Sequence, residues 1–415
     1  MVTVEANLYS PPQELITRPD IYRPNHVAYV REAIDQLRID YKGYKLYKAG
    51  IPGYGRPFFR DMAIASRLFR DPEMIANSLV FASALQAKEA NSSNGAQPGK
   101  IFHEYDTVLQ DGIELSQNPG KNTLFNSCDS TAEFLKSHEE YIGLTGDYSL
   151  LRSQRASVED AADKYIVPQI NESSLFTEDP RFCGADNFAL KVTYWKDSVL
   201  PDRPNGEPIY PVVYPFAHIQ NAAALRSAGI LLARPDLTRK ANEMTKAFPD
   251  LFDNKLNTFY SAIDKRGRIS GVTSDSLHVL AYLEPGDLPP DIIVKIIRSA
   301  EALETEVGYR TKDPKNADIV NDDYHTKTVW PHENAEIHKG ARRHFVAAVA
   351  SGDKNLDEGL SHVMEVSRRP APFYKSNPGR FPELFNIIDR DITPGGCDPQ
   401  LWSVAAADYF LRQAA

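Results

Sequence analysis

The sequence predicts an all-α protein in which helical pairs follow one another along the chain and close into a ring. Helical periodicity is the dominant pattern, strand-like patterns are few and short, and no sequence repeat marks an open solenoid. A closed stack needs about twelve helices of roughly 10 to 20 residues with their loops, or about 400 residues. The chain has 415 residues. We therefore expect one helical domain over residues 26–415, preceded by an extended arm of residues 1–25.

The first two helices are predicted from apolar spacing and from a helix-start signal. Residues 60–69 place Met62 and Phe69 in the apolar stripe of a core-facing helix. A second helix follows closely, with Asp71 as its N-cap and Pro72 at its first helical position. The same periodicity predicts further helices at residues 130–152, 213–233, 237–252, 289–303, 333–352, 355–369 and 398–414.

Strands and loops complete the expected order of elements. Short β patterns occur at residues 257–263 and 268–273. Stretches rich in Gly, Pro, Asn and Asp separate the helices, and this composition is typical of loops. Because a scaffold of helices gathers its working residues in loops at one end, we expect the long loops near residues 90–125 and 308–330 to form the rim of an active site.

Composition and charge argue against several classes of protein. A formal net charge of −9 argues against a nucleic-acid partner, because no basic face offsets the phosphate repulsion. The N-terminus lacks the pattern of a signal peptide, and the apolar stretch 222–233 contains Arg226 and is too short to cross a bilayer. We therefore expect no membrane partner. The three cysteines are odd in number and far apart, which favours a reducing compartment and hence the cytoplasm.

Polar residues mixed with aromatic ones gather in loops that precede the predicted helices. Such loops suit a sugar, because aromatic faces pack against C–H surfaces while charged groups and histidines bind hydroxyls. The stretches with this character are residues 58–63, 100–106, 125–131, 192–198, 323–335, 380–385 and 397–402.

Metal and nucleotide sites are poorly supported by the motifs. His103 and Glu104 match part of a zinc-binding motif, but Thr107 stands where the second histidine is required. The glycine-rich stretch 53–59 follows no convincing strand and has no phosphate-binding lysine. We therefore expect no metal and no organic cofactor.

Hydrolysis of a glycosidic bond requires two carboxyl groups, one protonated to assist the leaving group and one ionised to activate water or attack carbon. Asp197 is the better acid candidate, because Tyr194 and Trp195 precede it and burial against aromatic rings raises the pKa of a carboxyl group. Lys196 would oppose that rise if its ammonium pointed inward. Glu383 is the second candidate. Taken alone, each acid also suits a structural role, Asp197 in a cap or turn and Glu383 at a helix start.

Several stretches together resemble a known family. The series "FFRDMA", "KIFHEYD", "CDSTAEFL", "YWKDS", "YHTKTVWPHENA", "PELF" and "CDPQLWSVAA" resembles the six-hairpin glycosidases. It is most similar to the amylo-α-1,6-glucosidase domain of glycogen debranching enzymes and its stand-alone bacterial relatives. The resemblance extends from about residue 50 to the C-terminus. It implies an all-α fold of the (α/α)6 barrel type, a six-hairpin toroid with long loops at the active-site end.

The resemblance also implies roles for individual residues. The general acid of the family corresponds to Asp197 and its general base to Glu383, in an inverting mechanism with an expected carboxyl separation of about 6.5 to 9.5 Å. Arg60 and Asp61 correspond to an Arg-Asp pair that holds the sugar. The remaining substrate-binding residues expected by similarity are His103, Glu104, Asp129, Trp195, His325, Trp330, Glu333 and Trp402.

The function implied by these assignments is that of an exo-acting glycoside hydrolase. It would cleave a terminal α-linked glucosyl residue from an oligosaccharide or glucosyl conjugate. Glu333 replaces the Asp more usual in relatives, so both glycogen and shorter α-glucosides stay open as substrates. Two alternatives remain, a sugar epimerase of the same barrel class that uses paired histidines, and a carbohydrate-binding barrel without catalysis.

Overall fold

The computed structural model describes residues 24–105, 124–198, 200, 203–317, 323–388 and 391–413. The fold is mostly helical, as the sequence predicts. Residues 1–23 of the predicted arm (1–25) lie outside the described residues. The first helix begins at Pro24 and so includes the last two residues of that range. In the described ranges, none of the helices combines the length and the hydrophobicity that crossing a bilayer requires.

The longer helices account for most of the described chain. They are α1 (Pro24–Leu37), α2 (Phe59–Phe69), α3 (Pro72–Leu85), α4 (Ser130–Thr145), α7 (Pro215–Leu231), α8 (Pro235–Ala247), α10 (Pro290–Ala300), α12 (Pro331–Ser351), α13 (Lys354–Ser367) and α15 (Leu401–Gln413). Shorter ones are α5 (Ser149–Ser153), α6 (Arg155–Asp160), α9 (Asp275–His278), α11 (Pro314–Ala317) and α14 (Ala371–Ser376).

The predicted helices are confirmed, with one division and five omissions. Each predicted stretch contains a helix, but the stretch 130–152 holds two, because α4 ends at Thr145 and α5 begins at Ser149. Helices α1, α6, α9, α11 and α14 were not predicted. The last four have six residues or fewer, too few for a visible apolar stripe, whereas α1 carries such a stripe in Val27, Val30, Ile34 and Leu37 and was missed.

Local sequence explains several helix boundaries. Asp71 caps α3 as predicted, since its carboxylate accepts hydrogen bonds from the backbone N–H groups of Glu73 and Met74. Gly146 and Gly352 end α4 and α12 in the left-handed conformation, with φ of 68° and 74°, which glycine adopts without strain. Proline occupies the first position of α7, α8, α10 and α12, where its missing N–H costs nothing.

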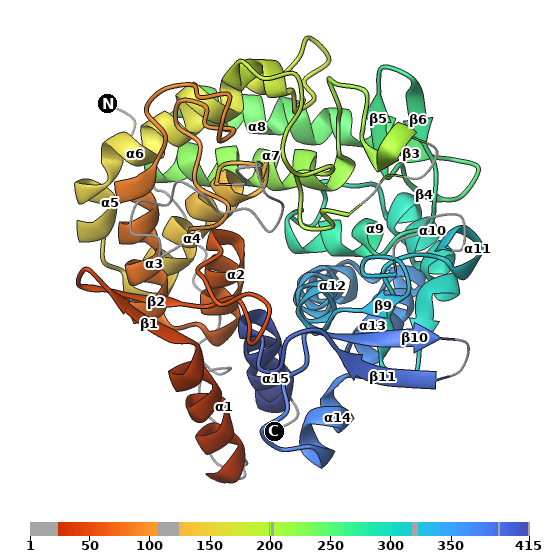
Figure 1. Cartoon of the computed structure of the whole chain (residues 1–415). Coiled ribbons are helices and arrows are strands. Elements are labelled where there is room, and N and C mark those ends of the chain that lie inside the picture. Colours follow the sequence, from red (N-terminus) through yellow and green to blue (C-terminus); the bar gives the residue numbers. More distant parts are fainter. Residues whose placement is uncertain are drawn as a thin grey trace, which may run out of the picture.

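Helices α2, α4, α7, α9, α12 and α15 pack in succession, each against the next, and α15 packs against α2. Figure 1 shows these helices around the centre of the view. On their outer side, α3 packs against α2 and α4, α8 against α7, α10 against α9, α13 against α12, and α1 against α15. The succession of inner helices is therefore closed, and the outer helices form a second layer around it.

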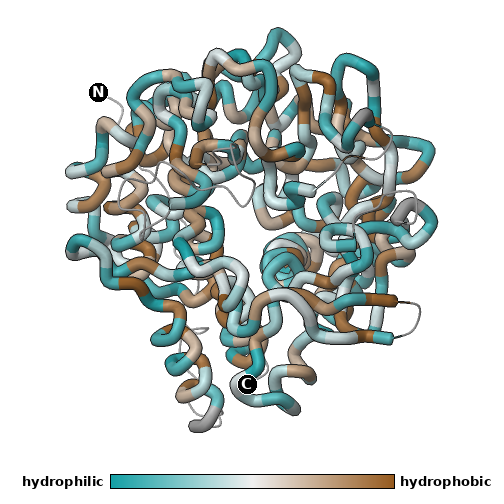
Figure 2. The backbone as a smooth tube through the Cα atoms, in the orientation of Figure 1, coloured by the Kyte–Doolittle hydropathy of each residue, from teal (hydrophilic) through white to brown (hydrophobic). Residues whose placement is uncertain are grey.

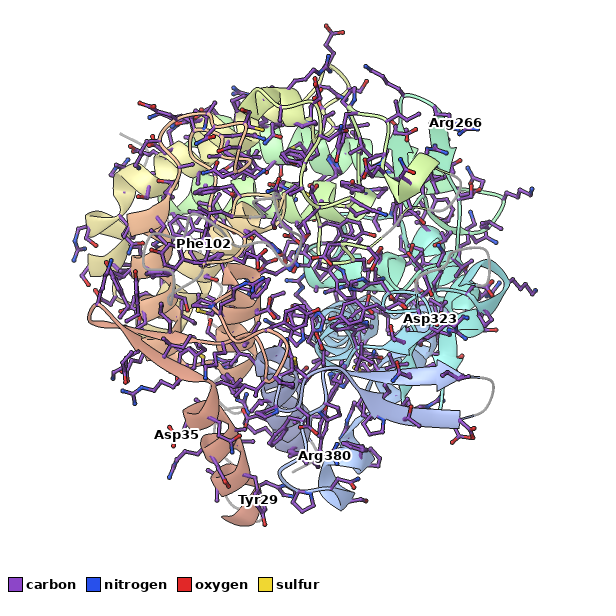
Figure 3. The ribbon with its side chains drawn as sticks, viewed as in Figure 1. Tyr29, Asp35, Phe102, Arg266, Asp323 and Arg380 are labelled. Atoms are coloured by element: carbon purple, nitrogen blue, oxygen red, sulfur yellow. The ribbon has the colours of Figure 1, made fainter. Side chains whose placement is uncertain are left out.

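The space between the helices is filled with side chains. Figure 2 shows hydrophobic and hydrophilic segments alternating along the helices, as expected where one face of each is buried. Figure 3 shows side chains crowding the interior, among them Phe102, which is fully buried. One close approach requires glycine: a Cβ at Gly340 of α12 would lie 2.5 Å from the backbone nitrogen of Ala281.

Strands are short and occur mainly as hairpins. The strand patterns predicted at residues 257–263 and 268–273 are confirmed. They overlap three strands that follow one another in the chain, Thr258–Phe259, Ala262–Asp264 and Gly267–Ile269. The antiparallel pairs are β1 (Arg38–Tyr41) with β2 (Tyr44–Tyr47), β3 (Phe252–Asp253) with β4 (Thr258–Phe259), β5 (Ala262–Asp264) with β6 (Gly267–Ile269), and β7 (Glu304–Thr305) with β8 (Gly308–Tyr309).

A three-stranded sheet of order β11-β10-β9 was not predicted, and it brings two distant stretches together. Strand β10 (Leu384–Ile388) pairs with β11 (Asp391–Gly395) and with β9 (Thr328–Val329). Glu383 directly precedes β10, while β9 follows Tyr324 and precedes α12. The sheet therefore places Glu383 beside the stretch 324–330.

Candidate active site

A cavity of about 180 Å³ gathers most of the residues that the sequence singled out. The predicted site residues on its wall are Arg60, Asp61, His103, Glu104, Trp195, Asp197, His325, Trp330, Glu383 and Trp402. Asp129 and Glu333 do not line it and are fully buried behind the wall. The wall also contains Ala49, Tyr54, Arg56, Phe58, Ala189, Leu190 and Tyr324.

The start of α2 and the loop around His103 form one side of the cavity. The N–H of Phe59 donates to the carbonyl oxygen of His103 at 2.9 Å, and Phe58 forms a β-bridge with Glu104. These backbone contacts place the start of α2, which carries Arg60 and Asp61, beside the loop that carries His103. Residues from two separate loops thus reach the same wall.

The carboxylate of Glu383 is buried and has two hydrogen-bond donors. The hydroxyl of Tyr324 donates to Oε1 at 2.5 Å, and the backbone N–H of Cys397 donates to Oε2 at 2.9 Å. Burial raises the pKa of Glu383, and the field of Asp197 adds to that rise, whereas both donors lower it. The two donors favour the ionised form of this carboxyl group.

Asp197 faces the same cavity in a different environment. Its side chain is about a quarter exposed, and Nη2 of Arg60 lies 3.1 Å from its Oδ2. Burial raises the pKa of Asp197 to about 6, although the Arg60 guanidinium opposes the rise. This carboxyl group therefore exchanges its proton near neutral pH, as a general acid must.

Asp129 acts on the site through Arg60. Both of its carboxylate oxygens lie 3.1 Å from Nη1 of Arg60, and the hydroxyl of Ser127 also donates to it. The sequence analysis placed Asp129 on the pocket wall. The structure corrects this position: Asp129 lies behind Arg60, because a buried guanidinium requires a buried counter-charge.

Two further carboxyl groups of the wall favour their protonated forms. Burial raises the pKa of Asp61 to about 8, helped by Glu383 and Asp197 and opposed by Arg60. Burial also raises the pKa of Glu104 to about 7, although Arg56 binds its Oε2 at 2.6 Å and opposes the rise. Protonated carboxyl groups can donate hydrogen bonds to the oxygens of a ligand.

Aromatic rings cover another part of the wall. The imidazole of His325 is stacked on Trp330, with ring centres 5.1 Å apart, and the edge of Trp195 meets both rings. Burial lowers the pKa values of His103 and His325 well below the usual range. Both imidazoles are thus neutral near pH 7, and the rings offer apolar faces to the C–H surfaces of a sugar.

Lys196 and Glu333 belong to a buried charged cluster next to the cavity. The ammonium of Lys196 lies 3.1 Å from Oε1 of Glu333, 2.9 Å from Oδ1 of Asp275 and 2.7 Å from Oγ of Ser274. Lys196 therefore points inward, yet its ion pairs are with these carboxylates, and the cation that contacts Asp197 is Arg60. Glu333 was expected on the cavity wall. In the structure it lies behind the wall and forms an ion pair with Lys196.

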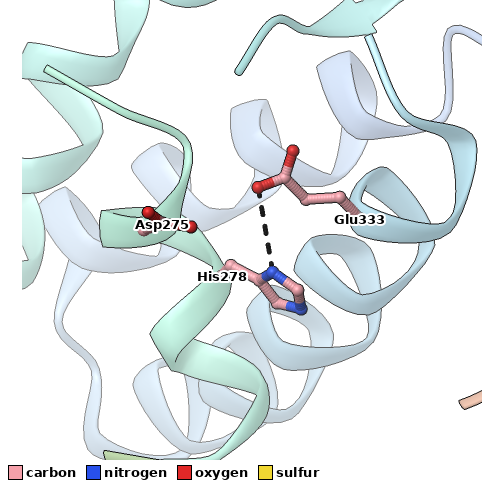
Figure 4. A group of neighbouring side chains, drawn as sticks. All are labelled: Asp275, His278 and Glu333. Carbon is pink, nitrogen blue, oxygen red and sulfur yellow. Dashed lines mark ion pairs between the residues drawn. The ribbon is translucent and has the colours of Figure 1, made fainter. Parts of the chain in front are cut away.

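Figure 4 shows Asp275, His278 and Glu333 facing one another, with the imidazole of His278 3.8 Å from Glu333. One ligand atom of each lies within 4.8 Å of the others, so the three side chains have the spacing of a metal site. The ammonium of Lys196 already lies 2.9 Å from the carboxylate of Asp275 and 3.1 Å from that of Glu333. A divalent cation would have to displace it, so we assign no metal to this cluster.

Seven wall residues were not among the predicted site residues: Ala49, Tyr54, Arg56, Phe58, Ala189, Leu190 and Tyr324. Tyr324 directly precedes His325 in the stretch 323–335, and its hydroxyl binds Glu383. Tyr54 and Arg56 lie in the glycine-rich stretch 53–59, and Phe58 also begins the aromatic stretch 58–63. These four have an aromatic or cationic side chain close in sequence to a predicted site residue, whereas the two alanines and Leu190 carry no such signal.

The sequence matches the family model described as amylo-alpha-1,6-glucosidase over residues 96–407. This range includes Asp197, Glu383 and the stretch 323–335. A comparison with curated proteins finds no significant match.

Solved structures share the fold at low identity. A GH63 mannosylglycerate hydrolase from Thermus thermophilus, in complex with glucose, has 12% identity and a TM-score of 0.61, over 93% of this chain and 99% of that one. A rhamnosidase from Klebsiella oxytoca with rhamnose bound has 14% identity and a TM-score of 0.54, over 95% and 65%. A GH78 rhamnosidase from a Bacillus species has 11% identity and a TM-score of 0.61, over 93% and 34%.

Proposed function

The chain belongs to the amylo-alpha-1,6-glucosidase family and is a glycoside hydrolase, and on this basis we propose an inverting, exo-acting enzyme that releases a terminal α-linked glucosyl residue. Asp197 is the general acid and Glu383 the general base. The closed succession of helices supports an (α/α)6 barrel as the scaffold. In this proposal residues 26–415 form a single catalytic domain.

The observation that carries the proposal is the contrast between two carboxyl groups of one cavity. Asp197, with a pKa of about 6, can hold a proton near neutral pH. Burial raises the pKa of Glu383 as well, but its two hydrogen-bond donors oppose that rise and favour the ionised form. This division of roles is what glycoside hydrolysis requires.

The chemistry follows from these two protonation states. Asp197 donates its proton to the glycosidic oxygen as the bond from that oxygen to C1 breaks. Glu383 accepts a proton from a water molecule whose oxygen attacks C1 from the opposite face of the ring. The configuration at C1 is inverted, and no covalent intermediate forms.

The other wall residues bind the terminal sugar in this proposal. Asp61 and Glu104 present carboxyl groups with raised pKa values toward the hydroxyls, and Arg60 and His325 contribute neighbouring polar groups. Trp195, with the other two tryptophans of the wall, packs against the sugar ring.

A short conjugate is one substrate class to test beside longer chains. The cavity measures about 180 Å³, enough for the terminal sugar, while the rest of the substrate can lie outside it. The mannosylglycerate hydrolase of similar fold, which this chain matches over 99% of its length, is named for a small hexosyl conjugate. We therefore place glucosylglycerate-like and mannosylglycerate-like conjugates beside short α-glucosides as substrates.

A sugar-release screen tests the proposal. Purified wild type would be incubated with α- and β-linked disaccharides, short dextrins, hexosyl glycerates and rhamnosides, beside Asp197→Asn and Glu383→Gln. We expect the wild type to release glucose from an α-linked substrate, and both variants to lose about 100-fold or more of that rate. NMR of the first product should show β-glucose. An α-anomer, or equal release by Asp197→Asn, would contradict the assignment.

A sugar epimerase is the second candidate, because the neutral imidazoles of His103 and His325 share the cavity wall. Separate replacement of His103 and His325 by Gln distinguishes the two functions. The hydrolase predicts that turnover depends on Glu383 more than on either histidine. Epimerised sugar that disappears with the histidines would favour the epimerase, and saccharide binding without turnover would favour a non-catalytic barrel.

We also propose that the protein works in the cytoplasm. All three of its cysteines are buried and free of disulfides, as is usual in a reducing compartment.

A further inference from the structure

We infer that Asp275, which does not line the cavity, is a positioning residue that holds the loop carrying Asp197. The inference rests on the proposed function, because it concerns how the general acid is placed. Asp275 begins the short helix α9, 78 residues after Asp197 in the chain.

The acid loop has no regular secondary structure of its own. Residues 192–198 belong to no helix or strand of the described chain. At its start, the backbone N–H of Cys128 donates to the carbonyl oxygen of Thr193 at 2.7 Å. The direction of the following residues therefore depends on what their side chains bind.

Asp275 binds two residues of this loop, one with each carboxylate oxygen. The hydroxyl of Tyr194 donates to Oδ2 at 3.0 Å, and the ammonium of Lys196 lies 2.9 Å from Oδ1. Tyr194 and Lys196 flank Trp195, and Lys196 directly precedes Asp197. One carboxylate thus binds both neighbours of Trp195, and one of them, Lys196, directly precedes the acid.

The surroundings make these bonds hard to exchange with water. Tyr194, Lys196 and Asp275 are 4%, 7% and 8% exposed. The hydroxyl of Ser274 and the carboxylate of Glu333 also bind the ammonium. The loop is therefore attached to α9 and α12, two of the inner helices. A buried ion pair of this kind is costly to break from one side.

Loss of the Asp275 carboxylate should affect the proton donor, Asp197, and not the base, Glu383. A general acid works only within hydrogen-bond reach of the leaving oxygen, and a displacement near 1 Å can cost about 100-fold in rate. Glu383 is held by Tyr324 and Cys397 instead. Loss of Asp275 should therefore displace the acid and leave the base in place.

Asp275→Asn tests this with two substrates that differ in their need for a proton. The wild type, Asp275→Asn and Tyr194→Phe would be assayed on the α-linked disaccharide that the wild type hydrolyses and on α-glucosyl fluoride. Fluoride leaves C1 with little assistance from an acid, whereas a sugar alkoxide needs protonation. We expect kcat on the disaccharide to fall about 10- to 100-fold in Asp275→Asn, with KM little changed and with fluoride hydrolysis within about threefold of the wild type.

The controls separate positioning from general damage. Asp253→Asn removes another buried carboxylate, one that binds the hydroxyl of Ser270 and the N–H of Lys255, and should change neither rate. Glu383→Gln should lose both rates, because the base serves both substrates. Thermal unfolding shows whether each variant is folded. If Asp275→Asn does not fold, the rates of Tyr194→Phe on the two substrates provide the test, because this variant loses the hydrogen bond to Asp275.

Three results would count against the inference. Equal losses on both substrates would show a structural role for Asp275 and overturn it, and so would an unchanged rate on the disaccharide. If the wild type hydrolyses none of the α-linked substrates of the sugar-release screen and no α-glucosyl fluoride, the proposed function fails and the inference fails with it; if the wild type cleaves only a hexosyl glycerate, that conjugate replaces the disaccharide in the comparison. A loss confined to the disaccharide supports both.

Discussion

Tyr324 donates a hydrogen bond to Oε1 of Glu383 across 2.5 Å, while the hydroxyl of Tyr54 lies 3.2 Å from the hydroxyl of Tyr324. The carboxylate of Glu383 therefore has a phenol on one oxygen and the N–H of Cys397 on the other. Burial raises the pKa of Glu383, and these donors oppose that rise. The hydrogen bond from Tyr324 therefore both orients the carboxylate and favours its ionised form.

Tyr324→Phe should move the acidic limb of the pH profile to higher pH. The Tyr324 hydroxyl lowers the pKa of Glu383, so its removal raises that pKa, and the base becomes ionised only at higher pH. A hydrogen bond to a charged group of about 1.5 to 3 kcal/mol corresponds to roughly one to two pH units. The measurement is kcat/KM between pH 4 and 8, with Tyr54→Phe as the control expected to shift less. An acidic limb that stays in place would contradict the role of Tyr324.

The fall of kcat/KM at high pH, the alkaline limb of the profile, should be set by the deprotonation of Asp197. The acid acts in its protonated form, so kcat/KM on a disaccharide should fall as pH rises through about 6, the pKa that burial gives Asp197. With α-glucosyl fluoride the limb should weaken, since protonation of the leaving group matters little there. A profile for the disaccharide that stays level up to pH 8 would reject Asp197 as the acid or its raised pKa.

The ion pair between Arg60 and Asp129 should matter for stability as well as for the site. Both side chains are buried, at 4% and 0% exposure, so Arg60→Met leaves the Asp129 carboxylate without its counter-charge. We expect the free energy of unfolding to fall by about 3 to 5 kcal/mol. Arg38→Met is the matched control, because its pair with Asp40 is 42% and 69% exposed, and exposed ion pairs contribute little to stability. Urea unfolding of both variants makes the comparison, and similar losses would contradict it.

The helices were predictable from sequence because their signals are local. Apolar periodicity marks α2 over ten residues, and the cap at Asp71 depends on the next three residues only. The loops of the site were predictable as a set, because aromatic and polar residues recur in them. The three-stranded sheet beside Glu383 was missed. Strand β10 is rich in strand-forming residues, but β9 has only two residues, and their pairing joins positions far apart in the chain, Phe385 and Val329.

What the sequence could not supply was the direction of side chains within the site. Asp129 and Glu333 are site residues by similarity, yet each is fully buried and bound to a cation, Arg60 for one and Lys196 for the other. These pairs join residues 69 and 137 positions apart (129 − 60 and 333 − 196). The sequence shows that these charged residues are present. Which of them contact a ligand and which form ion pairs with one another depends on the fold.

Gly396→Ala should impair the base while leaving the fold intact. Gly396 has φ of +72°, and a Cβ there would lie 2.2 Å from Oε2 of Glu383, the oxygen that accepts the N–H of Cys397. The carboxylate must move, so we expect kcat to fall about 100-fold. Gly352→Ala is a matched control, because its φ of +74° brings the same backbone strain of about 1 kcal/mol with no atom within 4 Å of the added Cβ. Kinetics and thermal unfolding of both variants separate the effects: equal loss of activity in the two would mean that strain, and not the displaced carboxylate, is responsible.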